Sequence, residues 1–109
     1  NIAPDDRDVH DPAAWHEQIL CSTAERQALQ SLLHLGMHDS YRLLHEAGGV
    51  YSWWDYRQGA FRRNIGLRID LVLISSALRT RLLAAGIDKA PRKLERPSDH
   101  APAWVEMSP

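Results

Sequence analysis

Cysteine, long apolar runs and an excess of either charge are all scarce in this sequence, and each scarcity excludes a class of protein. Cys21 is the single cysteine, so no disulfide can form within the chain, and the composition suits a reducing compartment. The longest uncharged run, Leu71 to Leu78, contains two serines and is far shorter than a membrane span of about 20 residues. With 13 Lys and Arg against 14 Asp and Glu, a globally basic nucleic-acid binder is excluded, although one face can still be positive.

The remaining composition is that of a globular protein. Apolar residues make up 44% of the chain and charged residues 25%. A length of 109 residues allows one hydrophobic core and no second domain. The opening Asn-Ile-Ala-Pro resembles the interior of a longer chain, so we expect a fragment.

The first half of the chain predicts a loop, a helix and a strand. Ser22 and Glu25 have the spacing of a capping box, and the helical spacing of leucines that follows ends at Gly36. The segment 39–46 is ambiguous, with apolar residues on one helical face. The other segments are an acidic loop at 5–12, an aromatic strand at 51–56 and an irregular segment at 58–66.

The second half predicts two clear strands and a short helix. The segment 67–74, LRIDLVLI, is almost continuously apolar, which is typical of a central strand covered on both faces. Ser75 or Ser76 caps a helix that Gly86 closes, and 87–95 is a weaker strand candidate broken by Pro91. The segment 101–107 is the last strand, anchored by Trp104. This alternation favours an α/β architecture with parallel and antiparallel pairing both open.

Asp70 is the first candidate for chemistry, because it interrupts an apolar strand. A buried carboxylate needs a cationic or hydrogen-bonding partner. Arg68 lies two residues away on the same face and allows a purely structural ion pair. The residues alone leave both interpretations open.

The second candidate is Asp99-His100, on a loop between Pro97 and Pro102. In such a rigid loop both side chains can converge on one site, where Asp70 would orient His100 and Asp99 would orient a water or a metal-bound hydroxide. The alternative is an ordinary turn, in which Ser98 and Asp99 bond only to their own backbone.

Three segments extend this interpretation by resemblance. SWWDYR (52–57), GLRIDLVL (66–73) and PSDHAPAW (97–104) resemble the C-terminal half of the exodeoxyribonuclease III family of abasic-site endonucleases, in the endonuclease/exonuclease/phosphatase superfamily. The opening NIAP matches the same family. The SDH triplet fixes only the superfamily, whereas the first two segments are specific for the DNA-repair branch.

The resemblance implies a fold and an incomplete domain. The expected class is α/β (α+β), with one mixed sheet and flanking helices, which is half of a four-layer DNase I-like sandwich. Residues 1–109 would be the C-terminal part of that domain, without its N-terminal half. The apolar face left uncovered predicts self-association or packing on the missing half. The implied localisation is cytoplasmic, without a membrane.

The resemblance also implies an activity, which is hydrolysis of phosphodiesters with Mg²⁺ or Mn²⁺ in double-stranded DNA carrying abasic or 3′-end lesions. The catalytic residues would be Asn1, Asp70, Asp99 and His100. The metal would be held near Asn1, Asp99 and His100. The substrate would be bound by Trp53, Arg57, Asn64 and Leu67. Trp53 and Leu67 would form a pocket for the flipped abasic sugar. The alternatives are another phosphodiesterase or phosphatase of the superfamily, or a non-catalytic fragment with weak DNA binding. Without the family's metal-binding glutamate, we expect the fragment to be inactive alone.

Other residues receive simpler interpretations. Trp53 and Trp54 face opposite ways on a strand, so Trp54 is predicted to lie in the core, and Trp15 and Trp104 to be packing residues. Arg62, Arg63 and Arg68 either contact phosphates or form a solvated surface. The remaining residues considered, which are His10, His16, His34, His38, His45 and Cys21, are given no role in a site.

Overall fold

The structure is a computed structural model that describes residues 1–109. Its two α-helices are α1 (Thr23–Leu33) and α2 (Ser40–Leu44). Its strands are β1 (Met37–Asp39), β2 (Trp53–Trp54), β3 (Gly66–Leu67), β4 (Leu73–Ser75), β5 (Leu82–Ile87) and β6 (Ala103–Met107). Four 3₁₀ helices complete the set, which are η1 (Asp6–Asp8), η2 (Arg57–Gly59), η3 (Ser76–Arg81) and η4 (Ala90–Lys93).

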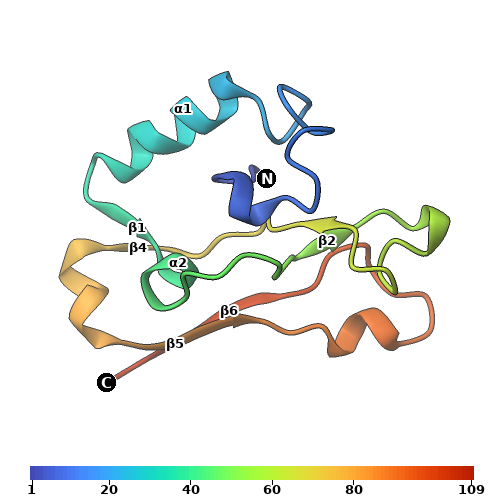
Figure 1. Ribbon diagram of the computed structural model, residues 1–109. Helices are drawn as coiled ribbons and strands as arrows, with labels where there is room; N and C mark the ends of the chain where they lie inside the picture. Colours follow the sequence, from blue (N-terminus) through green and yellow to red (C-terminus); the bar gives the residue numbers. More distant parts are fainter.

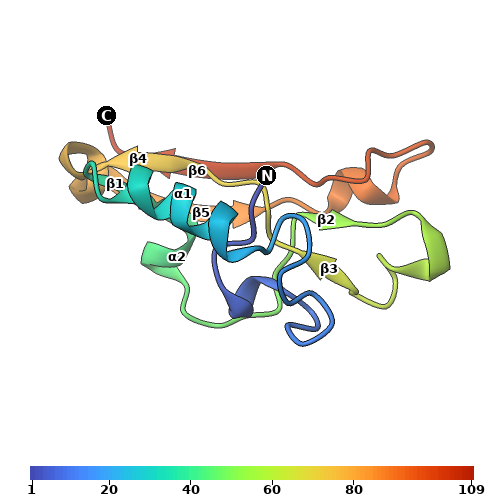
Figure 2. The same ribbon diagram turned by 90° about the horizontal axis from the view of Figure 1, so that it is seen from above.

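The strands form three antiparallel pairs, β1–β4, β2–β3 and β5–β6. The α/β class is therefore confirmed, but the expected single mixed sheet is replaced by three two-stranded sheets. Seen from above in Figure 2, β4 and β6 form one border of the molecule, and α2 and η1 lie on the opposite side. The molecule is flat, with extents of 42 × 32 × 22 Å. No helix combines the length and the apolar composition that crossing a membrane requires.

The helix α1 begins and ends where the sequence predicts. The Ser22 side chain accepts a hydrogen bond from the backbone N–H of Glu25, which satisfies one of the free donors of the first turn. The Glu25 carboxylate in turn accepts from the backbone N–H of Leu20. Gly36 has a φ of +98°, which glycine adopts without strain, and it turns the chain into β1. The ambiguous segment 39–46 contains α2.

The predicted central strand 67–74 is divided into β3 and β4. Between them, the backbone N–H groups of Ile69 and Asp70 both donate to the buried Ser52 Oγ, at 3.0 and 2.9 Å. The N–H of Arg68 donates to the Asp8 carbonyl. These donors are satisfied without a neighbouring strand, so the ladder is interrupted where the candidate Asp70 lies.

Two elements of the second half differ from the expectation. The segment after Ser75 is only the 3₁₀ helix η3, and Leu82 to Ile87 form strand β5 instead of continuing a helix. Pairing with β6 overrides the helix propensity of this Leu- and Ala-rich segment. The weaker strand candidate at 87–95 contains the 3₁₀ helix η4, since Pro91 suits the first turn of a helix.

The core consists of two small clusters on either side of β2. Trp53 packs against one cluster, formed by Ala3, Val9, Cys21, Leu67 and Ile69. Trp54 is fully buried in the other, with Tyr51, Ala60 and Ala101. This confirms that the two tryptophans face opposite ways. Trp104 is 42% exposed and its ring lies over Gly86, so it covers a strand rather than anchoring the core.

Gly66 allows β2 and β3 to approach closely. A Cβ at this position would lie 2.7 Å from the carbonyl oxygen of Trp53 and 2.7 Å from the indole of Trp54. Real Cβ atoms do not come this close to a backbone oxygen, so any larger residue would separate the two strands.

A buried ion cluster joins four separate parts of the chain. The Arg68 guanidinium binds Asp8 (Nε to Oδ1, 2.7 Å) and Asp39 (Nη1 to Oδ1, 3.0 Å), and Arg42 binds Asp8 as well. The Arg68–Asp70 ion pair, one of the two interpretations that the residues left open, is therefore absent, and Arg68 is too deeply buried to contact a phosphate. Burial opposes the charge of Arg68, but its hydrogen bonds to Asp39 and Asp8 prevail and raise the pKa of the guanidinium.

We expect Arg68→Met to destabilise the fold strongly. The substitution leaves Asp8 and part of Asp39 buried without Arg68, which costs about 3–5 kcal/mol in comparable buried pairs. Urea denaturation of the chain measures this loss. The control is Arg57→Met, because the Arg57–Asp55 pair lies on the surface. Equal unfolding midpoints for both variants would contradict a stabilising role for the cluster.

Candidate active site

Asp70 and His100 form the centre of the candidate site. Their side chains meet at 2.7 Å, His100 Nδ1 to Asp70 Oδ2, although 30 residues separate them in the chain. Asp70 lies in the interruption between β3 and β4, and His100 lies just before β6, where its backbone pairs with Trp53. The pairing that the sequence predicts is therefore present in the structure.

The pair fixes the tautomer of the imidazole. An ionised carboxylate can only accept hydrogen bonds, so Nδ1 of His100 carries the proton that is donated to Asp70. Nε2 then faces away from Asp70 and is free to meet a ligand. The His100 side chain is 34% exposed, so this nitrogen can be reached from solvent.

Asp70 is itself held from three directions. Its second oxygen, Oδ1, accepts from the Asn1 side-chain amide at 3.3 Å, and its backbone N–H donates to Ser52 Oγ. Asn1 also donates to the Ile69 carbonyl at 3.2 Å. Because both carboxylate oxygens are bonded, the carboxylate cannot rotate away from His100.

Asp99 reaches the same place through Trp53. The Trp53 indole N–H donates to Asp99 Oδ2 at 3.1 Å, while Asp99 Oδ1 lies 3.9 Å from His100 Nε2. Oδ1 accepts no hydrogen bond from the protein. A carboxylate oxygen and an imidazole nitrogen therefore lie side by side, and neither atom makes a hydrogen bond within the protein.

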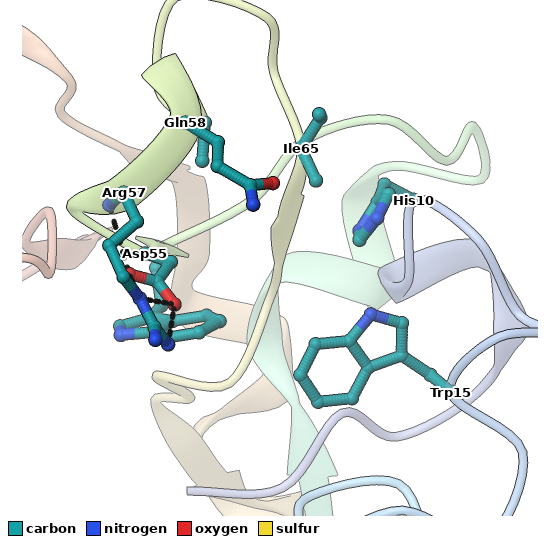
Figure 3. Close-up of a pocket in the computed structure, with 8 residues that line it drawn as sticks. His10, Trp15, Asp55, Arg57, Gln58 and Ile65 are labelled. Atoms are coloured by element: carbon teal, nitrogen blue, oxygen red, sulfur yellow. Dashed lines mark hydrogen bonds and ion pairs between the residues drawn. The ribbon is translucent and has the colours of Figure 1, made fainter.

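A pocket of about 450 Å³ opens next to Trp53 (Figure 3). Figure 3 shows Trp15 and His10 on one side of it and Arg57, Asp55 and Gln58 on the other. Its lining residues are His10, Trp15, Trp53, Asp55, Arg57, Gln58, Ala60 and Ile65. The rings of Trp15 and Trp53 meet edge to face, with centroids 6.4 Å apart. The same indole of Trp53 thus lines the pocket and orients Asp99.

The structure assembles most of the predicted residues, but it puts others to different use. Asn1, Asp70, Asp99 and His100 are together, and Trp53 and Arg57 line the pocket. Leu67 is fully buried and does not line the pocket. It pairs with Trp53 across β2 and β3, and its side chain packs in the apolar cluster. The Asn64 side chain accepts from the Trp54 indole at 3.1 Å and donates to the Gly49 carbonyl at 3.2 Å, so its amide is engaged within the fold and does not line the pocket.

Several residues of the site were missed by sequence reasoning, among them Trp15, His10 and Ser52. Trp15, interpreted as a packing residue, and His10 both line the pocket. The segment 5–16 has no regular spacing, so no pattern predicts which of its side chains turn toward β2. Ser52 carries no signal of its own either, although it lies inside the recognised SWWDYR segment.

The residues in place do not form a complete metal site. No group of three or more His, Cys, Asp or Glu side chains lies close enough to hold an ion. Mg²⁺ prefers several oxygen ligands, and both Asp70 oxygens are already bonded to the protein. The carboxylate oxygen left free at this site is Asp99 Oδ1. The predicted set of Asn1, Asp99 and His100 thus offers at most two oxygen donors and one nitrogen.

The fold and the site together define a class of protein. An oriented Asp–His pair, a second carboxylate beside it and arginines near the pocket rim are suited to hydrolysis of an anionic ester. The chain belongs to the Endonuclease/Exonuclease/phosphatase family, whose model matches residues 1–100.

The relatives include DNA-repair enzymes. Exodeoxyribonuclease III of Haemophilus influenzae is 41% identical over 98% of this chain and 43% of its own length. The structure of the 3′ phosphatase NExo from Neisseria, bound to a product DNA hairpin, has a TM-score of 0.96 at 51% identity, over 99% of this chain and 42% of that one. An AP endonuclease from Archaeoglobus fulgidus has a TM-score of 0.91 at 33% identity, over 97% of this chain and 42% of that one. The chain spans less than half the length of these proteins.

We expect Asp55, at the pocket rim, to remain ionised below the ordinary carboxyl pKa. Hydrogen bonds from the Arg57 side chain lower the pKa of Asp55 from 3.8 to about 2. The Asp55–Arg57 pair is therefore complete above the ordinary carboxyl pKa and is lost only as the pH falls through about 2.

Carboxyl-detected NMR titration measures this value. Arg57→Met should return the Asp55 midpoint toward 3.8, whereas Arg81→Met, whose guanidinium binds the Ser108 carbonyl, should leave it unchanged. A midpoint near 3.8 in the unaltered chain would contradict the pairing.

Proposed function

We propose that the natural protein carrying this sequence hydrolyses phosphate esters in damaged double-stranded DNA, as an exodeoxyribonuclease III with abasic-site endonuclease activity. The position of Trp53 supports this most strongly. Its indole lines the pocket and orients Asp99, and its backbone pairs with His100. A group held in the pocket therefore lies beside the side chains that would act on its phosphate.

The proposed roles follow from the hydrogen bonds. Asp70 holds His100 so that Nε2 faces a phosphate oxygen, where a protonated imidazole offsets the growing negative charge. Asp99 accepts a proton from the attacking water through its free Oδ1. The water oxygen bonds to phosphorus, the P–O bond to the leaving sugar oxygen breaks, and that oxygen takes up a proton from solvent water. Asn1 keeps Asp70 in place.

The pocket supports a preference for a sugar that has lost its base. Its walls include Trp15, Trp53 and Ile65, which suit the apolar face of a deoxyribose turned out of the duplex. Arg57, Arg62 and Arg63 are exposed on the adjoining segment and can contact phosphates, despite the net charge of −1. Arg57 shares its charge with Asp55, so Arg62 and Arg63 are the freer cations.

Divalent metal dependence is part of the proposal, with Mg²⁺ or Mn²⁺ near Asn1, Asp99 and His100. When bound, such an ion offsets charge on the phosphate oxygens. Because these residues alone do not complete a Mg²⁺ ligand set, we assign no step to the ion.

Removal of a 3′-terminal phosphate is a second candidate. The neighbour at 51% identity is described as a 3′ phosphatase and also as a 3′-5′ exonuclease. The same Asp–His pair and free carboxylate oxygen suit a phosphate monoester. Self-association remains a further proposal, supported by large apolar side chains that are exposed, such as Leu35 and Leu83.

The test is hydrolysis of three DNA duplexes, with an internal abasic analogue, a 3′ phosphate or an undamaged 3′ end, each in Mg²⁺ and in EDTA. We expect cleavage in Mg²⁺ by the natural protein, and His100→Ala or Asp70→Asn should lower the rate about 10²–10⁴-fold. His34→Ala is the control, because His34 is exposed at the end of α1.

The preferred duplex separates the candidates. Cutting only at the 3′ phosphate favours the phosphatase, and cutting at the abasic analogue favours the endonuclease. Equal rates for His100→Ala and His34→Ala would overturn the assigned site. The 109-residue chain, assayed in parallel, is expected to be inactive alone.

A further inference from the structure

The loop that carries Asp99 and His100 is tied down through its main chain. The hydroxyl of Tyr56 donates to the Pro97 carbonyl at 2.8 Å, and Nη1 of Arg92 donates to the Ser98 carbonyl at 3.0 Å. These two carbonyls immediately precede Asp99. The donors come from the two sides of the loop, Tyr56 from the segment after β2 and Arg92 from η4.

Arg92 is an unusual residue to hold a surface loop. It is 8% exposed and forms no ion pair with any carboxylate. Its guanidinium instead lies among three aromatic rings, 4.7 Å from the centre of Phe61, 5.6 Å from Tyr56 and 5.8 Å from Trp54. Its Nε is buried without a hydrogen-bond partner. Burying a cation in this way is costly, so the surrounding structure must hold it there.

The backbone of the loop also needs such a tether. Arg96 has a φ of +52°, and it precedes Pro97. Residues before proline favour extended conformations, and residues other than glycine rarely adopt positive φ. A strained residue of this kind persists only when its surroundings fix it. Tyr56 and Arg92 hold the carbonyls of Pro97 and Ser98, the two residues that follow Arg96.

We propose that Arg92 and Tyr56 are positioning residues that fix Asp99 and His100 against Trp53 and Asp70 by clamping the Pro97 and Ser98 carbonyls. Neither residue reaches a substrate phosphate itself in this role. Without the clamp the loop relaxes outward, and the Trp53–Asp99 hydrogen bond is the first contact to loosen. The consequence for catalysis rests on the proposed function, whereas the placement of the loop does not.

Two indole N–H groups provide a reporter and its control. The Trp53 indole donates to Asp99 Oδ2 in the clamped loop, and the Trp54 indole donates to Asn64 Oδ1 outside it, both at 3.1 Å. Their solvent exchange rates can be followed by ¹⁵N NMR in the 109-residue chain, and in the natural protein that carries it.

The experiment compares Tyr56→Phe, Arg92→Met and Arg92→Lys with the unaltered protein. Tyr56→Phe removes one hydroxyl from a residue that is 62% exposed, so the fold is retained. We expect exchange of the Trp53 N–H to accelerate about 5- to 10-fold in Tyr56→Phe and Arg92→Met. The Trp54 N–H should stay unchanged in Tyr56→Phe, the variant that keeps the Arg92 guanidinium beside the Trp54 ring. Arg92→Lys keeps a cation and a donor and should restore the slow exchange. Tyr41→Phe is the matched control, since its hydroxyl makes no hydrogen bond in the structure.

Activity gives the second readout. In the natural protein, Tyr56→Phe should lower kcat several-fold and leave KM within about twofold, because the loop orients the reacting groups rather than binding the substrate. Unchanged Trp53 exchange in Tyr56→Phe and Arg92→Met, or equal acceleration at Trp53 and Trp54 in Tyr56→Phe, would overturn the proposal. A different result separates the two proposals. If the unaltered natural protein hydrolyses none of the three duplexes, but Tyr56→Phe accelerates exchange of the Trp53 N–H alone, the proposed nuclease function is wrong and the positioning role of Arg92 and Tyr56 is supported.

Discussion

The buried Arg68 guanidinium is neutralised by two carboxylates from distant parts of the chain, and the rest of the structure depends on this ion cluster. Its carboxylate partners Asp8 and Asp39 come from the N-terminal segment and from β1, and Arg42 of α2 completes the cluster. The three strand pairs share no hydrogen-bonded ladder. The ion cluster and the two small apolar clusters therefore hold the strand pairs together, and in the view of Figure 1 the N-terminal segment lies between α1 and the strands.

The site depends on this frame because Asp70 follows Arg68 by two residues. Arg68 fixes one end of the interruption between β3 and β4, and Ser52 accepts the next two backbone donors. Ser52 also accepts the N–H of Ala101, which follows His100 directly. Ser52 thus connects the segments that carry Asp70 and His100. The next residue, Trp53, binds Asp99 and lines the pocket. Rigidity comes from hydrogen bonds between segments rather than from a large core.

Sequence reasoning was most successful where the signal is local or carried by a motif. The cap at Ser22 predicts the start of α1, and strand alternation predicts that Trp53 and Trp54 face opposite ways. Its failures have a common cause. The residues left the partner of Arg68 undecided, and the Leu- and Ala-rich segment 82–87 was predicted to be a helix, because partners distant in sequence leave no trace in local spacing.

By itself the sequence determined the α/β class, the family resemblance and the identity of the acidic and imidazole groups, because residue type and short-range spacing are written into the chain. The tertiary structure alone decided the partners that no pattern predicts. It bonded Arg68 to Asp8 and Asp39, buried Leu67, and brought Trp15 and His10 to the pocket. These choices depend on which buried donors and charges find partners across the chain, a condition that only the folded molecule satisfies.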